Sequence, residues 1–511
     1  MDDATYRPED QCDGPIATHC LTQARSSKSD VDTIGRCAAM AVSPDQQQPP
    51  AGVGSPLPSP RLRVRVRDTT LVPPSPSPPE TSLPLTFLDI FWLHSPPVER
   101  LFIYRLAPDA DVDAIISRLR DSLHQAVRAF YPLAGRLRLT PGTSDRYELH
   151  YRPGDAVTFT VAECDDDDAD AHFDALATDE PREVAKIATL VPPLPERGGL
   201  FAVQATLLPA RRGLSIGVTV HHAACDGSGS THFLHTWAVA CRAGAEAPPP
   251  PPPVIDRSLI ADPRRMYDVF IQGAPSTEEY EFVKMSADQL FATFALSKDE
   301  LKRIKDAVAE EAARRGVAPP RCSSLVATFG FVWSCYQQAK EASSGAGEFP
   351  MTCMAFPVDH RSRMEPPLPD KYLGNCVGPA FALAPTGELA QAGAGGFFSA
   401  CAAVASSIDE AVRDIETSNV EVWFDRIRDL IPMGFLTVAG SPRFRVYDMD
   451  FGFGRPAKVD VVSVARTGAV AVAESWDGNG GIEVGVSLQP AAMKRYRKCF
   501  ADAIAWLHQR T

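Results

Sequence analysis

Residues 214–227 read LSIGVTVHHAACDG, and this stretch decides how the rest of the chain is interpreted. Over 214–220 apolar side chains alternate with small ones, which predicts a β-strand. Apolar residues at helical spacing follow over 233–241. The histidine-rich segment between them therefore lies on a strand-to-helix connection, where side chains can project into a cleft.

Within this connection His222 is the candidate general base. Adjacent residues of a strand point to opposite faces, so only one of His221 and His222 can enter a given cleft. An unperturbed imidazole has a pKa of about 6.5 and can accept a proton near neutral pH. Asp226 either orients that imidazole or holds the turn by pairing with a basic residue. Gly227 permits the tight backbone that the turn needs.

The composition is that of a globular protein and excludes several functions. The chain has 511 residues, of which 44% are hydrophobic, and its formal net charge of -13 argues against a general nucleic-acid binder. It has no apolar run that could cross a bilayer and no apolar stretch after its acidic N-terminus, so we expect a cytoplasmic protein with no membrane partner. The 12 cysteines form no C-x-x-C pair and are interpreted as reduced thiols.

Shifts in composition divide the chain. Residues 1–60 are polar and without period, which predicts a disordered extension, and Met40 is a plausible native start. Alternation over 61–67 predicts a half-buried strand with a basic outer face. Two α/β halves of similar size around a shared cleft are the simplest architecture. We expect an N-terminal domain over 61–262, a crossover linker over 263–290 and a C-terminal domain over 291–511.

Local signals predict particular elements. Apolar residues at helical spacing over 112–130 predict an amphipathic helix that stops at Tyr131-Pro132. Ser297 and Glu300 fit a capping box at the start of another helix. Near the C-terminus we expect a strand around 482–486 and a closing helix over 491–507.

Two motifs resemble those of the plant BAHD acyltransferases, which use coenzyme A thioesters. His222–Asp226 resembles the H-x-x-x-D motif, a pattern also similar to condensation domains and chloramphenicol-type acetyltransferases. Asp450-Phe451-Gly452-Phe453-Gly454 resembles the family's D-F-G-W-G, with Phe453 in place of Trp, and it decides between these families. Residues 83–89 and 131–137 are also family-like. The resemblance implies an α/β fold of two chloramphenicol-acetyltransferase-like domains, each a mixed sheet with flanking helices, joined by a long crossover loop.

A third motif resembles one clade of that family. Tyr372-Leu373-Gly374-Asn375-Cys376 is similar to the Y-F-G-N-C of anthocyanin and flavonoid glycoside acyltransferases, with Leu373 for Phe. Many members transfer malonyl groups to a sugar hydroxyl of a phenolic glucoside. The resemblance implies substrate-binding roles for Tyr372 and Asn375, and for Arg182, whose guanidinium could grip the malonyl carboxylate bidentately. Alternatively, Arg182 is a solvated loop residue.

The chemistry follows from an alcohol acceptor and a thioester donor. His222 removes the hydroxyl proton as the oxygen attacks the thioester carbonyl, which gives a tetrahedral oxyanion and no acyl-enzyme. No G-x-S-x-G elbow suggests a serine nucleophile. By resemblance, Asp226 is mainly structural and pairs with an arginine, for which Arg361 is the best local candidate. The Asp450–Gly454 loop, by the same resemblance, shapes the cleft and the coenzyme A site.

Coenzyme A is anionic, so an acidic chain needs a local basic patch to bind it. Arg443, Arg455 and Lys458 near the Asp450 loop are candidates, and Ser323 and Ser324 open a predicted helix whose N-terminus favours phosphate. Surface charge and simple capping are the alternatives.

We expect no metal and no permanently bound cofactor, with acyl-CoA as co-substrate. The run Asp165–Asp168 lacks the spacing of a calcium loop and is interpreted as a solvated acidic loop. His222 and Asp226 lack a third metal ligand. We expect a monomer whose partners are acyl-CoA and a small phenolic or flavonoid glycoside. A hydroxycinnamoyl or acetyl donor, an amine acceptor and a non-catalytic binding protein stay open as alternatives.

Overall fold

The computed structural model describes the chain from Leu62 to Arg510 with short gaps. Three predictions fall outside the described residues: the disordered extension over 1–60 with Met40, the acidic run beyond Asp165, and the middle of the 263–290 linker. The described ranges are 62–165, 172–243, 251–274, 285–344, 349–417, 419–433 and 435–510.

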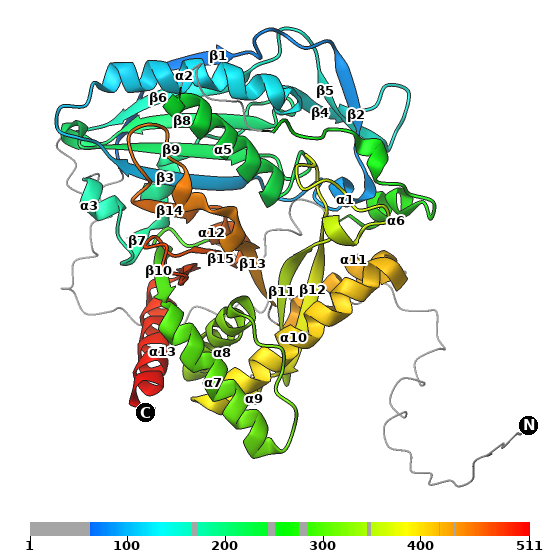
Figure 1. Ribbon diagram of the computed structural model, residues 1–511, viewed down its shortest axis with the longest axis vertical. Helices are drawn as coiled ribbons and strands as arrows, with labels where there is room; N and C mark the ends of the chain where they lie inside the picture. Colours follow the sequence, from blue (N-terminus) through cyan, green and yellow to red (C-terminus); the bar gives the residue numbers. More distant parts are fainter. Residues whose placement is uncertain are drawn as a thin grey trace, which may run out of the picture. The chain divides into compact units, whose positions relative to one another are not determined.

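The first main sheet is mixed and follows the order β1-β6-β8-β9-β3-β14. Only β6 and β8 run parallel among its described strands. Helices α2 (Val112–Ala129) and α5 (Gly227–Ala243) pack together over this sheet (Figure 1). A smaller sheet is formed by β2 (Thr81–Pro84), β5 (Tyr147–Tyr151) and β4 (Arg136–Leu139). The strands of the main sheet are β1 (Val64–Val72), β6 (Val157–Cys164), β8 (Phe201–Leu207), β9 (Gly213–Val220), β3 (Val98–Arg105) and β14 (Lys458–Val461).

Strand β9 is the one predicted from the alternation over 214–220, and it lies inside the sheet. All of its residues are buried, the small ones between the apolar ones included. Gly217 lets the backbone at Leu190 pack directly against the strand, because a Cβ there would lie 2.1 Å from the carbonyl oxygen of Leu190. The chain that leads into the histidine segment is therefore fixed on both faces.

The strand predicted over 61–67 forms, and the start of its apolar face is covered, since Leu62 is buried and Val64 packs against the core, but Val66 departs from the pattern. In β1 the side chain of Val66 is 58% exposed, and the register with β6 shifts between Val66 and Asp68. The shift breaks the alternation, because an extra residue in one strand turns the following side chains to the other face. As the edge strand of its sheet, β1 instead pairs its arginines Arg65 and Arg67 with Glu163.

The second main sheet is also mixed and follows the order β12-β11-β13-β15-β16-β10-β7. The predicted capping box is confirmed, since Ser297 and Glu300 cap each other's backbone at the start of α7. The late strand and the closing helix are confirmed as β16 and α13. The strands are β12 (Val377–Pro385), β11 (Met351–Asp359), β13 (Phe435–Gly440), β15 (Ala469–Glu474), β16 (Ile482–Leu488), β10 (Leu290–Leu296) and β7 (Arg182–Glu183).

Helices flank this second sheet and share its apolar core. They are α7 (Lys298–Arg315), α8 (Ser324–Ser344), α10 (Ala394–Thr417) and α13 (Pro490–Gln509). Among the residues that the structure describes, none of the helices is both long and apolar enough to cross a bilayer.

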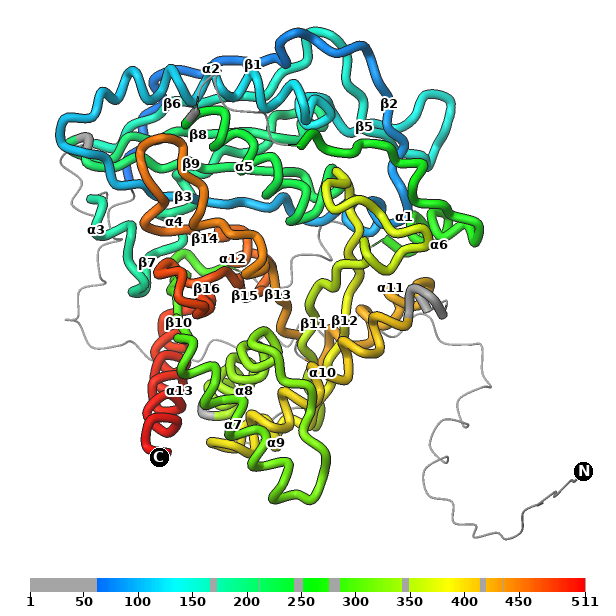
Figure 2. Tube along the Cα trace, viewed as in Figure 1, coloured from blue at the N-terminus to red at the C-terminus, as the bar shows by residue number. Residues whose placement is uncertain are grey.

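The two main sheets exchange strands. Strand β7 comes from the predicted N-terminal domain, yet it pairs with β10 of the second sheet. Strand β14 comes from the predicted C-terminal domain, yet it pairs with β3 of the first sheet (Figure 2). The predicted α/β fold with two mixed sheets and flanking helices is confirmed. The predicted boundaries stay a prediction, and each half contributes a strand to the sheet of the other.

Candidate active site

His222 lies just beyond the end of β9. Its ring stacks on the indole of Trp92 with ring centres 3.9 Å apart and planes 9° from parallel. Its backbone carbonyl accepts a hydrogen bond from Nδ2 of Asn375 at 2.9 Å, while its Nδ1 is buried and has no hydrogen-bond partner among the described residues. Burial lowers the pKa of His222 below its ordinary value. The imidazole is therefore neutral and able to accept a proton at neutral pH.

His221 is held within its own turn. Its Nδ1 accepts a hydrogen bond from the backbone N–H of Ala223 at 3.2 Å, and its own N–H donates to the carbonyl of Leu200 at 2.9 Å. Burial lowers the pKa of His221 to about 4. The structure thus ties the ring of His221 to the backbone.

Asp226 forms an ion pair with Arg361, and its negative charge also raises the pKa of His222 against the larger effect of burial. The closest atoms of the two charged groups are 2.8 Å apart, and both side chains are buried. The carboxylate also accepts from the backbone N–H groups of Gly229 and Cys376, each at 3.0 Å. The carboxylate of Asp226 therefore caps the start of α5 through Gly229 and holds the neighbouring loop through Cys376 and Arg361. Of the two roles left open for Asp226, the structure displays the pairing with a basic residue.

The 372–376 motif supports the histidine loop from behind. Tyr372 and Asn375 are both 0% exposed, so the structure does not place these predicted substrate-binding side chains on a substrate surface. Asn375 donates from Nδ2 to the carbonyl of His222 and, at 3.0 Å, to Asp89. Arg361 donates to the carbonyls of Tyr372 and Gly374 at 3.2 Å. The motif positions His222 through its main chain.

A buried ion pair between Asp89 and Arg257 completes this support, and it was not predicted. Arg257 donates to both carboxylate oxygens of Asp89 at 2.9 Å and to the carbonyl of Ala224 at 2.9 Å. Asp89 lies in the family-like stretch near the N-terminus, but nothing in the sequence marks Arg257 as its partner. Trp92 was also not predicted, because a tryptophan in an apolar stretch is usually a core residue.

The Asp450–Gly454 loop is closed by its own aspartate. Oδ1 of Asp450 accepts from the N–H groups of Gly452 at 2.7 Å and Gly454 at 3.0 Å, and both glycines have a positive φ, +97° and +100°. Phe451 packs edge-on against Trp237 of α5, with ring centres 4.7 Å apart. Phe453, where the family has Trp, packs edge-on against Tyr104 at 5.0 Å. An aromatic plate is therefore kept.

Arg182 lies on β7 in a buried ion pair. Its guanidinium donates to the two carboxylate oxygens of Asp460 at 2.7 and 2.9 Å and to the carbonyl of Leu176 at 2.7 Å. The pair links β7 of one sheet to β14 of the other, which explains the burial of a residue that the sequence places in a loop. The solvated alternative for Arg182 is wrong, and the predicted malonyl contact would compete with Asp460.

The predicted coenzyme A contacts lie apart from one another. Lys458 is buried and pairs with Asp179, and Arg455 donates to the carbonyl of Tyr447 at 2.8 Å. At the start of α8 the hydroxyl of Ser323 caps the N–H of Val326 at 3.2 Å. Ser324 accepts from Lys305 at 2.9 Å, so a cation stands beside this helix start.

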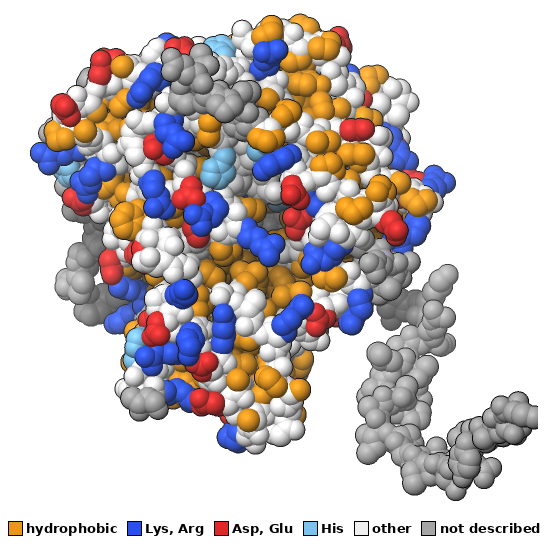
Figure 3. Space-filling view, viewed as in Figure 1, with side chains coloured by type: hydrophobic (Ala, Val, Ile, Leu, Met, Phe, Trp, Pro, Cys, Tyr) orange, Lys and Arg blue, Asp and Glu red, His pale blue; other side chains and the backbone are white. Residues whose placement is uncertain are grey.

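Arg443 lines a surface cleft beside α5. Its wall includes four other basic or titratable side chains: His232, His235, Lys371 and Arg445. Figure 3 shows Lys and Arg side chains intermixed with Asp and Glu side chains on this face of the molecule, with a histidine among them. Phe444 lines this cleft and also a cavity between the two sheets. Burial lowers the pKa of His232 to about 4, and Arg445 pairs with Asp448 at 2.8 Å, so Arg443 and Lys371 supply the positive charge of this cleft.

The fold and the site define an acyl-CoA-dependent acyltransferase. Residues 62–502 match the family described as the Transferase family, and the chain belongs to this family, the BAHD acyltransferases. The resemblance to this family stated from the motifs is confirmed.

Two relatives and one solved structure show how close the likeness is. A malonyl-CoA:anthocyanidin 5-O-glucoside-6''-O-malonyltransferase of Arabidopsis thaliana is 32% identical over 442 residues, covering 83% of this chain and 95% of that protein. Phenolic glucoside malonyltransferase 1 of the same plant is 33% identical over 458 residues, covering 83% and 94%. The structure of F. graminearum TRI101 with ethyl coenzyme A superimposes with a TM-score of 0.62 at 16% identity, covering 82% of this chain and 97% of that one.

Proposed function

We propose that this enzyme transfers the malonyl group of malonyl-CoA to a sugar hydroxyl of a phenolic or flavonoid glucoside. The neutral, half-buried imidazole of His222, stacked on Trp92 and held through its backbone by Asn375, is the observation that carries the acyl transfer. The choice of malonyl and of a glucoside is supported by the names of the two Arabidopsis relatives at 32% and 33% identity.

In this mechanism His222 accepts the proton of the acceptor hydroxyl while the oxygen forms a bond to the thioester carbonyl carbon. The carbonyl becomes a tetrahedral oxyanion, and its collapse breaks the carbon–sulfur bond. The thiolate of coenzyme A leaves and takes the proton back from the imidazolium. The products are the malonyl ester and free coenzyme A, and the histidine returns to its neutral state.

For the donor, we propose that the basic cleft around Arg443 takes the phosphates of coenzyme A. Lys371 lies on the same wall and supplies further positive charge, whereas the charge of Arg445 there is paired with Asp448 at 2.8 Å. Phe444 lines both this cleft and the inner cavity, so the two adjoin at this ring. The helix start at Ser323 and Ser324, with Lys305, stays a second predicted phosphate contact.

Free thiol release tests the proposed function. We expect release from malonyl-CoA with phenolic glucosides and none with the sugar-free phenols, and mass spectrometry should find the malonyl group on the sugar. A preference for a hydroxycinnamoyl donor would overturn the malonyl assignment but leave acyl transfer in place. No release from any acyl-CoA with a broad set of glycosides and amines would favour the non-catalytic alternative.

The pH profile of kcat/KM should report the protonation of His222. Protonated imidazole cannot accept a proton, so the rate falls as the pH drops through the pKa of His222. Because burial lowers that pKa, the acid limb should lie below about pH 6.5, the ordinary value for histidine. Measuring kcat/KM from about pH 5 to pH 8 checks this. An acid limb at or above the ordinary value would contradict it.

A further inference from the structure

Arg100 of β3 is a buried cation without a carboxylate partner. Its side chain lies in the first sheet beside β14, and the residue is only 7% exposed. Its guanidinium donates to the hydroxyl of Thr231 at 2.8 Å and lies over the ring of Phe444, 5.6 Å from its centre. Among the described residues there is no carboxylate within ion-pair distance of it. The negative charge of Asp226 acts on Arg100, but that carboxylate is already paired with Arg361. A buried charge without a counter-ion of its own is costly, which points to a ligand that supplies one.

The other arginines that are buried among the described residues provide a direct comparison. Arg182, Arg257 and Arg361 each contact a buried aspartate, at 2.7, 2.9 and 2.8 Å respectively. The fold therefore pairs its buried guanidinium groups where they serve structure. Burial lowers the pKa of Arg100 to about 10, so it keeps its charge at neutral pH.

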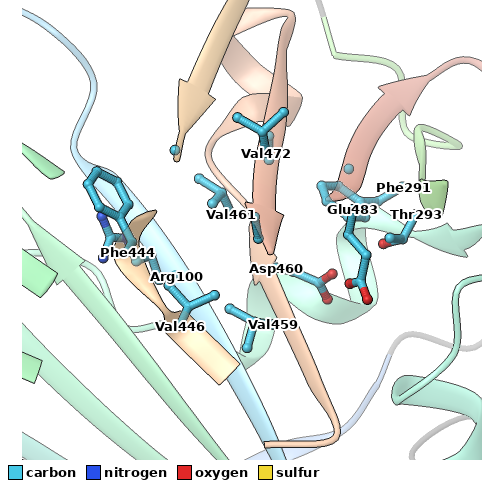
Figure 4. A pocket seen from close by; sticks show the side chains of 14 residues that line it. Arg100, Phe291, Thr293, Phe444, Val446, Val459, Asp460, Val461, Val472 and Glu483 are labelled. Carbon is cyan, nitrogen blue, oxygen red and sulfur yellow. The ribbon is translucent and has the colours of Figure 1, made fainter. Parts of the chain in front are cut away.

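Arg100 also faces the cavity between the sheets. Figure 4 shows Arg100 and Phe444 on one side of this cavity, Asp460 and Glu483 on the other, and valine side chains between them. The two acidic groups have partners of their own. Asp460 binds Arg182, and Glu483 accepts from the hydroxyl of Tyr447 at 2.6 Å with Lys458 4.0 Å away.

The cavity side of Arg100 adjoins the catalytic segment. Gly227 follows Asp226 directly, and a Cβ at Gly227 would lie 3.5 Å from a terminal nitrogen of Arg100 and 2.6 Å from the ring of Phe444. The glycine therefore lets Phe444 and the guanidinium pack closely against the turn that contains His222. The charge of Arg100 reaches the imidazole, because it contributes to the lowered pKa of His222.

We propose that Arg100 binds the free carboxylate of the donor's acyl group and so selects a dicarboxylic acyl thioester over a neutral one. This inference rests on the proposed malonyl transfer and assigns the carboxylate contact to a residue other than Arg182. A guanidinium offers a planar fork that matches a carboxylate, and a desolvated site strengthens the interaction. Phe444 covers the other face of the guanidinium and keeps it in place.

The test compares donors in an Arg100→Met variant. Binding of malonyl-CoA and acetyl-CoA is measured by calorimetry without an acceptor, and kcat/KM is measured with both. We expect the preference for malonyl-CoA over acetyl-CoA to fall roughly 10–100-fold, the loss of one charged hydrogen bond. The Tm should stay the same or rise, because an unpaired buried charge is removed. Arg361→Met, which strands a buried aspartate, is the matched control and should lower the Tm.

Other outcomes separate this inference from the proposed function. Equal weakening of both donors, or a fall in Tm as large as that of Arg361→Met, would make Arg100 structural and overturn the proposal. Wild-type protein that binds both donors equally would also overturn it, whatever the thiol-release assay finds. If glucosides are not acylated but Arg100→Met still loses malonyl-CoA selectively, the contact stands and the acceptor is wrong. Thr231→Val, which frees the guanidinium, should lower the same preference by a smaller factor.

Discussion

Replacing His222 with alanine should lower kcat by roughly 10²–10⁴-fold, the usual contribution of a positioned general base. The ring stacks on Trp92 and sits at the end of a strand fixed on both faces, so the base is oriented before substrate arrives. Without the His222 ring, the imidazole that stays in this turn is that of His221. Its Nδ1 already accepts a hydrogen bond from the N–H of Ala223, so it is held by the backbone. Steady-state kinetics with malonyl-CoA and a phenolic glucoside measures the loss.

His221→Ala is the matched control for this prediction. Its effect on the chemical step should be far milder, although the turn loses the contact from Ala223 to the ring. Circular dichroism and the Tm establish that both variants fold. Near-normal turnover in a folded His222→Ala protein would end the general-base mechanism, and an equal loss in both variants would mean that the turn, not the imidazole, is what matters.

The local parts of this site could be predicted because their signals lie close together in the sequence. The strand over 214–220, the turn with His222 and Asp226, and the capping box at Ser297 each depend on neighbouring residues. A strand of two residues such as β7 has no period to detect. The exchange of β7 and β14 between the sheets therefore could not be predicted, nor could the pairing of Arg182 with Asp460 across 278 positions.

The roles of several site residues depend on what surrounds them in space. Tyr372 and Asn375 belong to a motif, but a motif does not say whether a side chain faces substrate or the loop behind it. Arg100 is inconspicuous in the sequence, because a missing partner can be recognised only when all of its neighbours are placed. The stacking of Trp92 on His222 is of the same kind, since the two residues are far apart along the chain.

Replacing Asp226 with alanine should lower both activity and stability. Arg361 would keep the carbonyls of Tyr372 and Gly374 and a partly exposed Asp359 at 3.2 Å, but it would lose its buried counter-ion. Breaking a buried pair by removing one partner typically costs about 3–5 kcal/mol, because a charge is left uncompensated. Two backbone N–H groups, those of Gly229 and Cys376, would also lose their acceptor. The Tm and the free energy of unfolding measure the stability term.

Asp226→Asn separates the charge from the hydrogen bonds, because its amide oxygen can still accept from one of the two N–H groups. A double-mutant cycle with Arg361→Met then isolates the pair, and we expect the double variant to be more stable than the sum of the single losses predicts. Asp226→Asn also removes a negative charge that raises the pKa of His222, so the acid limb of its residual activity should move to lower pH. A limb that moves to higher pH would contradict this, and additive losses in the cycle would remove the ion pair from the explanation.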